Sequence, residues 1–132
     1  MGNLLMTTKQ ECDLDGLAQR VEAAIGKQQR ELLYEAWDAL GPIARWKPEQ
    51  ASRFASLMDL EGYVSAALMF VPAGAFWRVG HDGEGPDPSM FAGTIGIEQE
   101  GDVWITFRKA TADTAPLAIL AASLRARSAV QS

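Results

Sequence analysis

The residues that could do chemistry gather in one stretch, GHDGEGPDPS at residues 80–89. His81, the only histidine, stands directly before Asp82, and such a pair could begin a metal site or a His–Asp catalytic pair. One imidazole supplies at most one ligand, however, and no nucleophile motif stands beside it. A phosphate cradle needs a following helix and usually a lysine, whereas this acidic stretch lies between two expected strands. We therefore predict a solvent-exposed hairpin loop without a catalytic role.

Two other groups of reactive side chains have a simpler explanation than chemistry. Glu31, Glu35 and Asp38 fall on one side of an expected helix, where carboxylates are typical of a solvated face. Cys12 is the only cysteine, which excludes an internal disulfide and a cysteine-based zinc site. No basic residue next to it would activate its thiol. We predict no catalytic residue, no metal site and no cofactor, and hence a protein that is not an enzyme.

Tryptophan and arginine side chains are the best candidates for a binding surface. Trp46 lies in a short linker, Arg78 follows Trp77 on an expected strand, and Trp104 and Arg108 lie on another. These residue types are enriched at the energetic centres of interfaces, and they also stack nucleic-acid bases. The candidate binding surface is therefore Trp46, Arg78, Trp104 and Arg108. The alternative is that Trp104 packs under the N-terminal helices or against a dimer partner.

Composition and charge favour a soluble globular domain. The chain has 132 residues, 48% of them hydrophobic and 22% charged, which suits one domain over residues 1–132. A net charge of −5 repels phosphate backbones and disfavours nucleic acid as a partner. The opening MGNLLMTTKQE lacks a signal-peptide pattern, and no segment is apolar for long enough to span a membrane. We expect a cytoplasmic protein, either a monomer or a homodimer.

The first half of the chain is helical by its apolar period. Apolar residues recur at helical spacing behind capping residues and before glycine or proline stops. The pattern predicts four helices, within residues 12–27, 28–42, 47–58 and 58–74. Leu60 belongs to the apolar stripe expected for the fourth helix, and Gly41-Pro42 is expected to end the second. We expect residues 1–10 to be disordered and residues 11–46 to form the N-terminal helices.

From residue 75 the apolar period changes from 3.6 to 2, which predicts strands. Three short strands are expected in AFWRV, MFAGTIGIE and DVWITFRKA, and DTAPLAILAASLRARSA is expected to close the chain as a helix. The fold class is therefore α+β. A helical N-terminal half precedes an α-β-β-β-α order, with a three-stranded antiparallel meander packed between helices. Residues 47–128 would form this α/β sandwich core.

Alternation along the third strand predicts which side chains face the core. Val103, Ile105 and Phe107 should point to the flanking helices, and Trp104, Thr106 and Arg108 should point the other way. Phe76 and Arg78 on the first strand are expected to join the second group, with Trp77 and Val79 turned inward. That second face is too apolar to stay wet, so either the helices of residues 13–40 or a second copy of the chain should cover it. We favour the helices.

Three segments carry a resemblance to a known family. LEGYVSAALMFVPAGAFWRVG, FAGTIGIE and ATADTAPLAILAASLRARSA resemble the small phage and prophage proteins that share the phage ABA sandwich domain. The resemblance covers roughly residues 30–128, and TADTAPLAILAASLRAR is its most specific element. The chain departs from the family pattern at Phe76, where a second tryptophan is expected, and in the long acidic stretch 81–89. The resemblance implies a phage origin and a two-layer α/β domain, and it brings no catalytic residues.

These observations favour a small accessory protein of phage or prophage origin in the host cytoplasm. We expect it to act as a non-enzymatic module that binds a host or phage protein. The alternative is a small-molecule binder that captures a nucleotide signal of host defence through tryptophan and arginine side chains.

Overall fold

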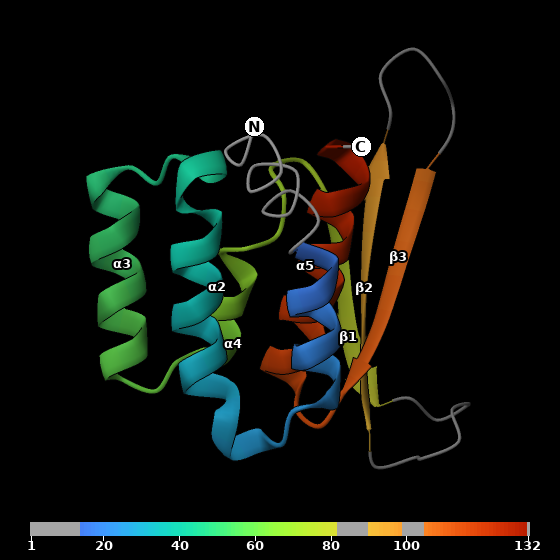
Figure 1. Cartoon of the computed structure of the whole chain (residues 1–132), viewed down its shortest axis with the longest axis horizontal. Coiled ribbons are helices and arrows are strands. Elements are labelled where there is room, and N and C mark those ends of the chain that lie inside the picture. Colours follow the sequence, from blue (N-terminus) through green and yellow to red (C-terminus); the bar gives the residue numbers. More distant parts are fainter. Residues whose placement is uncertain (1–13, 82–89, 99–104, 132) are drawn as a thin grey trace, which may run out of the picture.

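The computed structural model describes residues 14–81, 90–98 and 105–131, and it confirms the α+β fold class (Figure 1). Residues 14–23 form the first helix. The remaining elements are a short 3-10 helix η1 (Gly26–Gln28), α2 (Gln29–Ala44), α3 (Pro48–Asp59), α4 (Tyr63–Leu68), β1 (Phe76–His81), β2 (Phe91–Glu98), β3 (Ile105–Ala112) and α5 (Ala115–Gln131). The expected order, a helical first half followed by α-β-β-β-α, is therefore observed.

Two helix boundaries differ from the expected ones. α2 continues through Pro42 to Ala44 and ends at Arg45, whose backbone is left-handed (φ 51°). The fourth helix is limited to α4, because Glu61 also takes a left-handed conformation (φ 58°) and turns the chain between α3 and α4. Leu60 lies in this turn and is 80% exposed, so its predicted place in an apolar stripe is wrong.

The sheet is an antiparallel meander in which β2 is central and β1 and β3 form the edges. Trp77 lies opposite Ile95 and Val79 opposite Gly93, so these side chains share one face of the sheet, because directly opposed residues point the same way. Ile95 is buried, which identifies this face as the one packed on α5. The inward orientation predicted for Trp77 and Val79 is confirmed.

The predicted orientation of β3 is wrong. Arg108 lies opposite Ile95, Ala110 opposite Gly93 and Ala112 opposite Phe91, so the even-numbered positions of β3 lie on the α5 face. Ala110 and Ala112 are buried there. Positions 105 and 107 consequently fall on the other face by register. The physical reason is that the small side chains of Ala110 and Ala112 let β3 approach α5 closely. The prediction instead assigned the α5 side to the bulky apolar positions 105 and 107.

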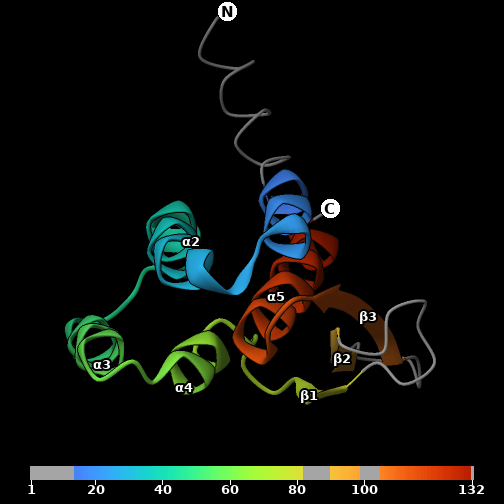
Figure 2. The same cartoon turned by 90° about the horizontal axis from the view of Figure 1, so that it is seen from below.

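α5 lies at the centre of the molecule rather than on its surface. Every residue from Pro116 to Leu124 is buried, so the helix is covered on all sides. The sheet packs on one side of α5, and the helix of residues 14–23 lies on the opposite side (Figure 2). α4 packs beside α5, and α2 and α3 lie further from the sheet. The main core is therefore formed around this one helix.

The described helices all lie on one side of the sheet, so the expected covering of the second face by the helices of residues 13–40 is wrong (Figure 2). Those helices bury Leu17, Val21 and Leu33 in the core cluster that includes α5. Since α5 is apolar all round, it offers the N-terminal helices a second side to bury against, and they do not need the sheet.

The start of α5 is tied to the N-terminal half by two adjacent polar residues. The Thr114 hydroxyl accepts a hydrogen bond from the Leu117 N–H (3.3 Å) and donates one to Gln29 Oε1 (3.0 Å). Asp113 Oδ2 accepts a hydrogen bond from the Gly26 N–H (2.7 Å). Thr114 thus satisfies an orphan donor in the first turn of α5, and Asp113 fixes the turn at η1.

Candidate functional site

Trp46 belongs to an aromatic cluster inside the helical half. Its ring stacks on Trp37 with centroids 3.9 Å apart and planes at 5°, and Trp37 stacks in turn on Phe54 at 4.1 Å. Phe70 meets all three rings edge-on. The Trp46 Nε1–H donates to the Trp37 carbonyl oxygen (3.1 Å), so the polar end of the indole also has a partner within the protein. The contacts of Trp46 are those of a packing residue.

Arg127 lies beside this aromatic cluster and is half-buried. Its Nε–H donates to the Phe70 carbonyl oxygen (2.7 Å), and its guanidinium carbon lies 5.9 Å from the centroid of the Trp46 ring. Burial lowers the pKa of Arg127 from its ordinary value. A carbonyl and a ring face are weak compensation for the lost hydration of a cation. We therefore interpret Arg127 as a packing residue of the aromatic cluster, whose long side chain covers one side of the Trp46 ring.

Arg108 and Arg78 lie on opposite faces of the sheet. Arg108 shares a face with Ile95 and Trp77, whereas Arg78 lies opposite Thr94 on the face away from α5. Trp104 lies outside the described residues. The structure therefore brings neither Trp46 nor Arg108 together with Arg78, and the four candidate residues do not form one described surface.

β1 exposes large side chains on both faces of the sheet. Phe76 is 60% exposed on the face away from α5, and Trp77 is 47% exposed on the α5 face. Arg78 is also exposed, and β1 forms an edge of the sheet (Figure 2). The sequence carried the signal for this feature. The first strand of a meander must be an edge strand, and adjacent aromatic residues on a strand must point to opposite faces.

The face of the sheet away from α5, which we call the open face, has small residues at its centre. β2 contributes Ala92, Thr94 and Gly96 to it. Arg78 on β1 and Lys109 on β3 both lie opposite Thr94, so two basic residues flank this row. The spacing of hydrogen-bonded strands puts the backbones of β1 and β3 about 10 Å apart. The open face is thus shallow along β2, with one basic residue on each side of Thr94.

Comparison with known proteins does not identify a function for this surface. The chain matches no family model, no curated protein and no solved structure.

The acidic residues predicted to form a solvated face of α2 are exposed, and one of them pairs with another helix. Glu31, Glu35 and Asp38 are exposed as expected, and Glu35 pairs with Arg20 (2.6 Å). Within the described residues, no group of three or more His, Cys, Asp and Glu side chains could hold a metal ion.

None of the helices in the described part of the chain is long and apolar enough to cross a membrane.

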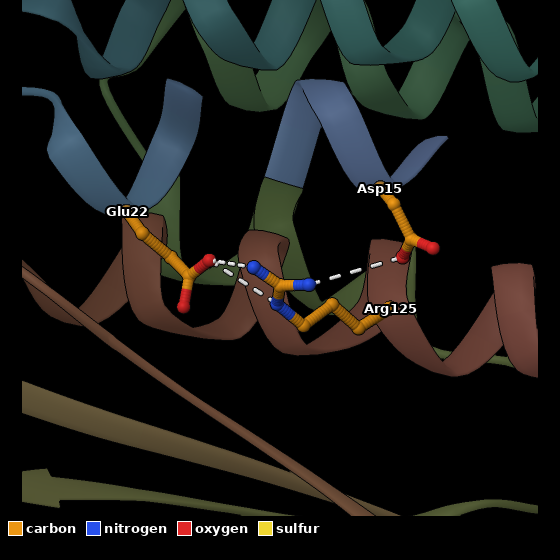
Figure 3. A network of polar contacts seen from close by, with 3 residues as sticks. All are labelled: Asp15, Glu22 and Arg125. Atoms are coloured by element: carbon orange, nitrogen blue, oxygen red, sulfur yellow. Dashed lines mark hydrogen bonds and ion pairs between the residues drawn. The ribbon is translucent and has the colours of Figure 1, made fainter. Parts of the chain in front are cut away.

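Arg125 joins α5 to the helix of residues 14–23 (Figure 3). Its Nε–H donates to Glu22 Oε1 (3.1 Å), and Nη2 pairs with the same oxygen. Nη1 lies 3.9 Å from Asp15 Oδ1 on the other side of the guanidinium. Arg125 and Glu22 are only about a quarter exposed (27% and 25% of the side chain), so the pair is partly shielded from water. We call this network the clamp, because Arg125 on α5 pairs with Glu22 and Asp15 on the neighbouring helix and so holds the two helices together.

His81 lies at the end of β1 and is exposed. Its ring contacts Phe91 with centroids 4.4 Å apart. The hairpin loop predicted for residues 82–89 lies outside the described residues, so this prediction stays a prediction.

Within the described residues the strongest candidate site is β1 together with the open face, a surface suited to contacts rather than to bond-making chemistry.

Proposed function

We propose that this chain is a non-enzymatic protein-binding module that uses β1 and the open face. The single observation that carries the proposal is the edge strand β1, which exposes Phe76 and Trp77 on opposite faces with Arg78 next to them. Exposed aromatic side chains beside an arginine are characteristic of the residues that dominate binding energies in interfaces.

The origin and location of the protein are part of the same proposal. We infer a small accessory protein of phage or prophage, which acts in the host cytoplasm on a host or phage protein. The support is the resemblance of residues 30–128 to phage ABA sandwich proteins, which implies a phage origin and a two-layer α/β domain. The alternative, a binder of a nucleotide signal, has less support. Trp46 stacks within the protein, and Arg78 and Arg108 lie on opposite faces.

Capture from a bacterial lysate tests the proposal. The immobilised full chain is compared with Phe76→Ser and Trp77→Ser, and captured proteins are identified by mass spectrometry. Leu60→Ser is the control, because Leu60 is also a large apolar residue, is even more exposed, and lies away from β1, between α3 and α4. We expect a protein that is captured by the parent and by Leu60→Ser and is lost from both β1 variants. Capture that is indifferent to the β1 variants, or the absence of any captured protein, contradicts the proposal.

A further inference from the structure

The strand β1 has a second side with which a strand could pair. Its residues from Phe76 to His81 pair with β2 on one side. On its other side no strand of the described residues pairs with it. Backbone N–H and C=O groups at such an edge are available to another extended chain. Proteins commonly protect an edge with proline, lysine or an inward charge, and the FWRVGH sequence of β1 contains neither proline nor lysine.

We propose that β1 accepts an extended, acidic segment of a protein partner as a fourth strand of the sheet. The inference rests on the proposed function, and it adds the binding mode and the chemistry of the partner. Strand addition of this kind draws its affinity from backbone hydrogen bonds and its specificity from alternate side chains. Phe76 and Arg78 would contact the partner on the open face, and Trp77 would contact it on the other.

Charge determines the chemistry of the partner segment. Arg78 is exposed on β1 and lies on the open face, although the chain as a whole carries a net charge of −5. A carboxylate on the added strand, placed opposite Arg78, would form a cross-strand ion pair. The neighbours of that carboxylate along the strand would lie over Trp77 and Val79, and the next residues would lie beside Phe76. The segment is therefore a β-forming one in which a glutamate or aspartate stands between apolar residues.

A second copy of the chain fits this edge less well. The strand β1 contains no acidic residue, so self-pairing would supply another Arg78 and no carboxylate. Like charges on neighbouring strands are destabilising. Nucleic acid would satisfy Arg78, but it would use neither the edge hydrogen bonds nor the two aromatic side chains on opposite faces. A partner protein with an acidic strand satisfies all three features.

Selection from a library of displayed random 12-residue peptides tests the inference on the immobilised full chain. We expect the selected peptides to be rich in Asp or Glu between β-branched or aromatic residues. For Arg78→Glu, the selected charge should reverse to Lys or Arg. Arg53→Glu is the matched control, because Arg53 is an exposed arginine on α3, and it should select the same acidic peptides as the parent. A selected acidic peptide should bind Arg78→Glu about tenfold more weakly than the parent, since an attractive cross-strand pair becomes a repulsive one.

Amide hydrogen exchange with the selected peptide distinguishes strand addition from other binding modes. We expect slower exchange within β1 and no comparable change in α2 or α3. Selection without acidic preference, protection located away from β1, or a chain that dimerises through β1 in light scattering would each overturn the inference. So would an Arg78-dependent affinity for a single-stranded oligonucleotide in place of the peptide. If capture from lysate still depends on Phe76 and Trp77 in that case, the proposed function stands and only the acidic-strand partner fails.

Discussion

The backbone of Gly93 on β2 lies directly against the carbonyl group of Ala118 on α5. A Cβ atom at position 93 would lie 2.6 Å from the Ala118 carbonyl oxygen and 2.8 Å from the carbonyl carbon. Backbone cannot move aside as a flexible side chain can, so this contact sets the distance between the sheet and α5. Ala110, next to Gly93 on β3, is buried at the same level. Small residues on two adjacent strands thus bring the sheet onto the central helix.

Gly93→Ala should destabilise the protein by about 1–3 kcal/mol, because the added methyl group must push the sheet away from α5. Gly80→Ala is the matched control. A Cβ at position 80 meets no atom within 4 Å, and its backbone φ is not positive. We expect the control to change the free energy of unfolding by less than about 0.5 kcal/mol in urea. Equal stability of the two variants would mean that the close approach at Gly93 is wrong.

Trp46→Ala should cost about 3 kcal/mol in the free energy of unfolding, because it removes a stacked ring and a hydrogen bond from the aromatic cluster. Trp77→Ala removes the same side chain from an exposed position on β1, and the expected cost is below about 1 kcal/mol. Chemical unfolding of both variants makes the comparison. The reverse order would mean that Trp46 is the surface residue and that the core assignment fails.

Ser123→Ala should leave stability unchanged or raise it by about 1 kcal/mol. The Ser123 hydroxyl is fully buried in α5 and has no hydrogen-bond partner among the residues that the structure describes, so its desolvation is uncompensated. Alanine keeps the helix and removes that cost. Ala122→Ser makes the opposite change at a neighbouring buried position and should destabilise by about 1–3 kcal/mol. A thermal unfolding midpoint that falls for Ser123→Ala would reveal a partner for this hydroxyl.

The sequence predicted the helices and strands better than it predicted which elements pack against each other. Alternation assigned β2 correctly, because Phe91, Ile95 and Ile97 alternate with small or polar residues. It failed on β3, where apolar residues stand in both phases and burial of Ala110 and Ala112 decides the orientation. Periodicity treats alanine as a weak apolar signal, although close packing against a helix requires small side chains.

The candidate site shows the same limit. Arg78 and Trp77 could be placed on an edge strand from the meander order alone. Trp46 could not be placed, because its ring partners are Trp37 and Phe70, and their meeting depends on how α2 and α4 pack. The position of the N-terminal helices depends likewise on α5 having two apolar sides. The packing of one helix on another depends on contacts between residues far apart in the sequence. A single sequence shows only the apolar period within each helix or strand.

The clamp between α5 and the helix of residues 14–23 gives the last prediction. Arg125→Met removes the bonds to Glu22 and Asp15 while keeping the length and the apolar stem of the side chain. We expect a loss of about 2 kcal/mol, because Glu22 keeps its charge in a partly shielded place without a partner. Amide exchange in residues 14–23 should quicken more than exchange in β2, since this helix is held at the outside of α5.

Arg20→Met provides the matched control for the clamp. Arg20 also bonds a glutamate, Glu35, but that pair is exposed, with 60% and 44% of the side chains accessible. Exposed pairs contribute little, so we expect no measurable loss of stability. Raising the salt concentration should weaken the Arg20 pair more than the shielded Arg125 pair. If Arg125→Met behaved like Arg20→Met in stability and exchange, the N-terminal helix would be held by its apolar face alone, through Leu17 and Val21.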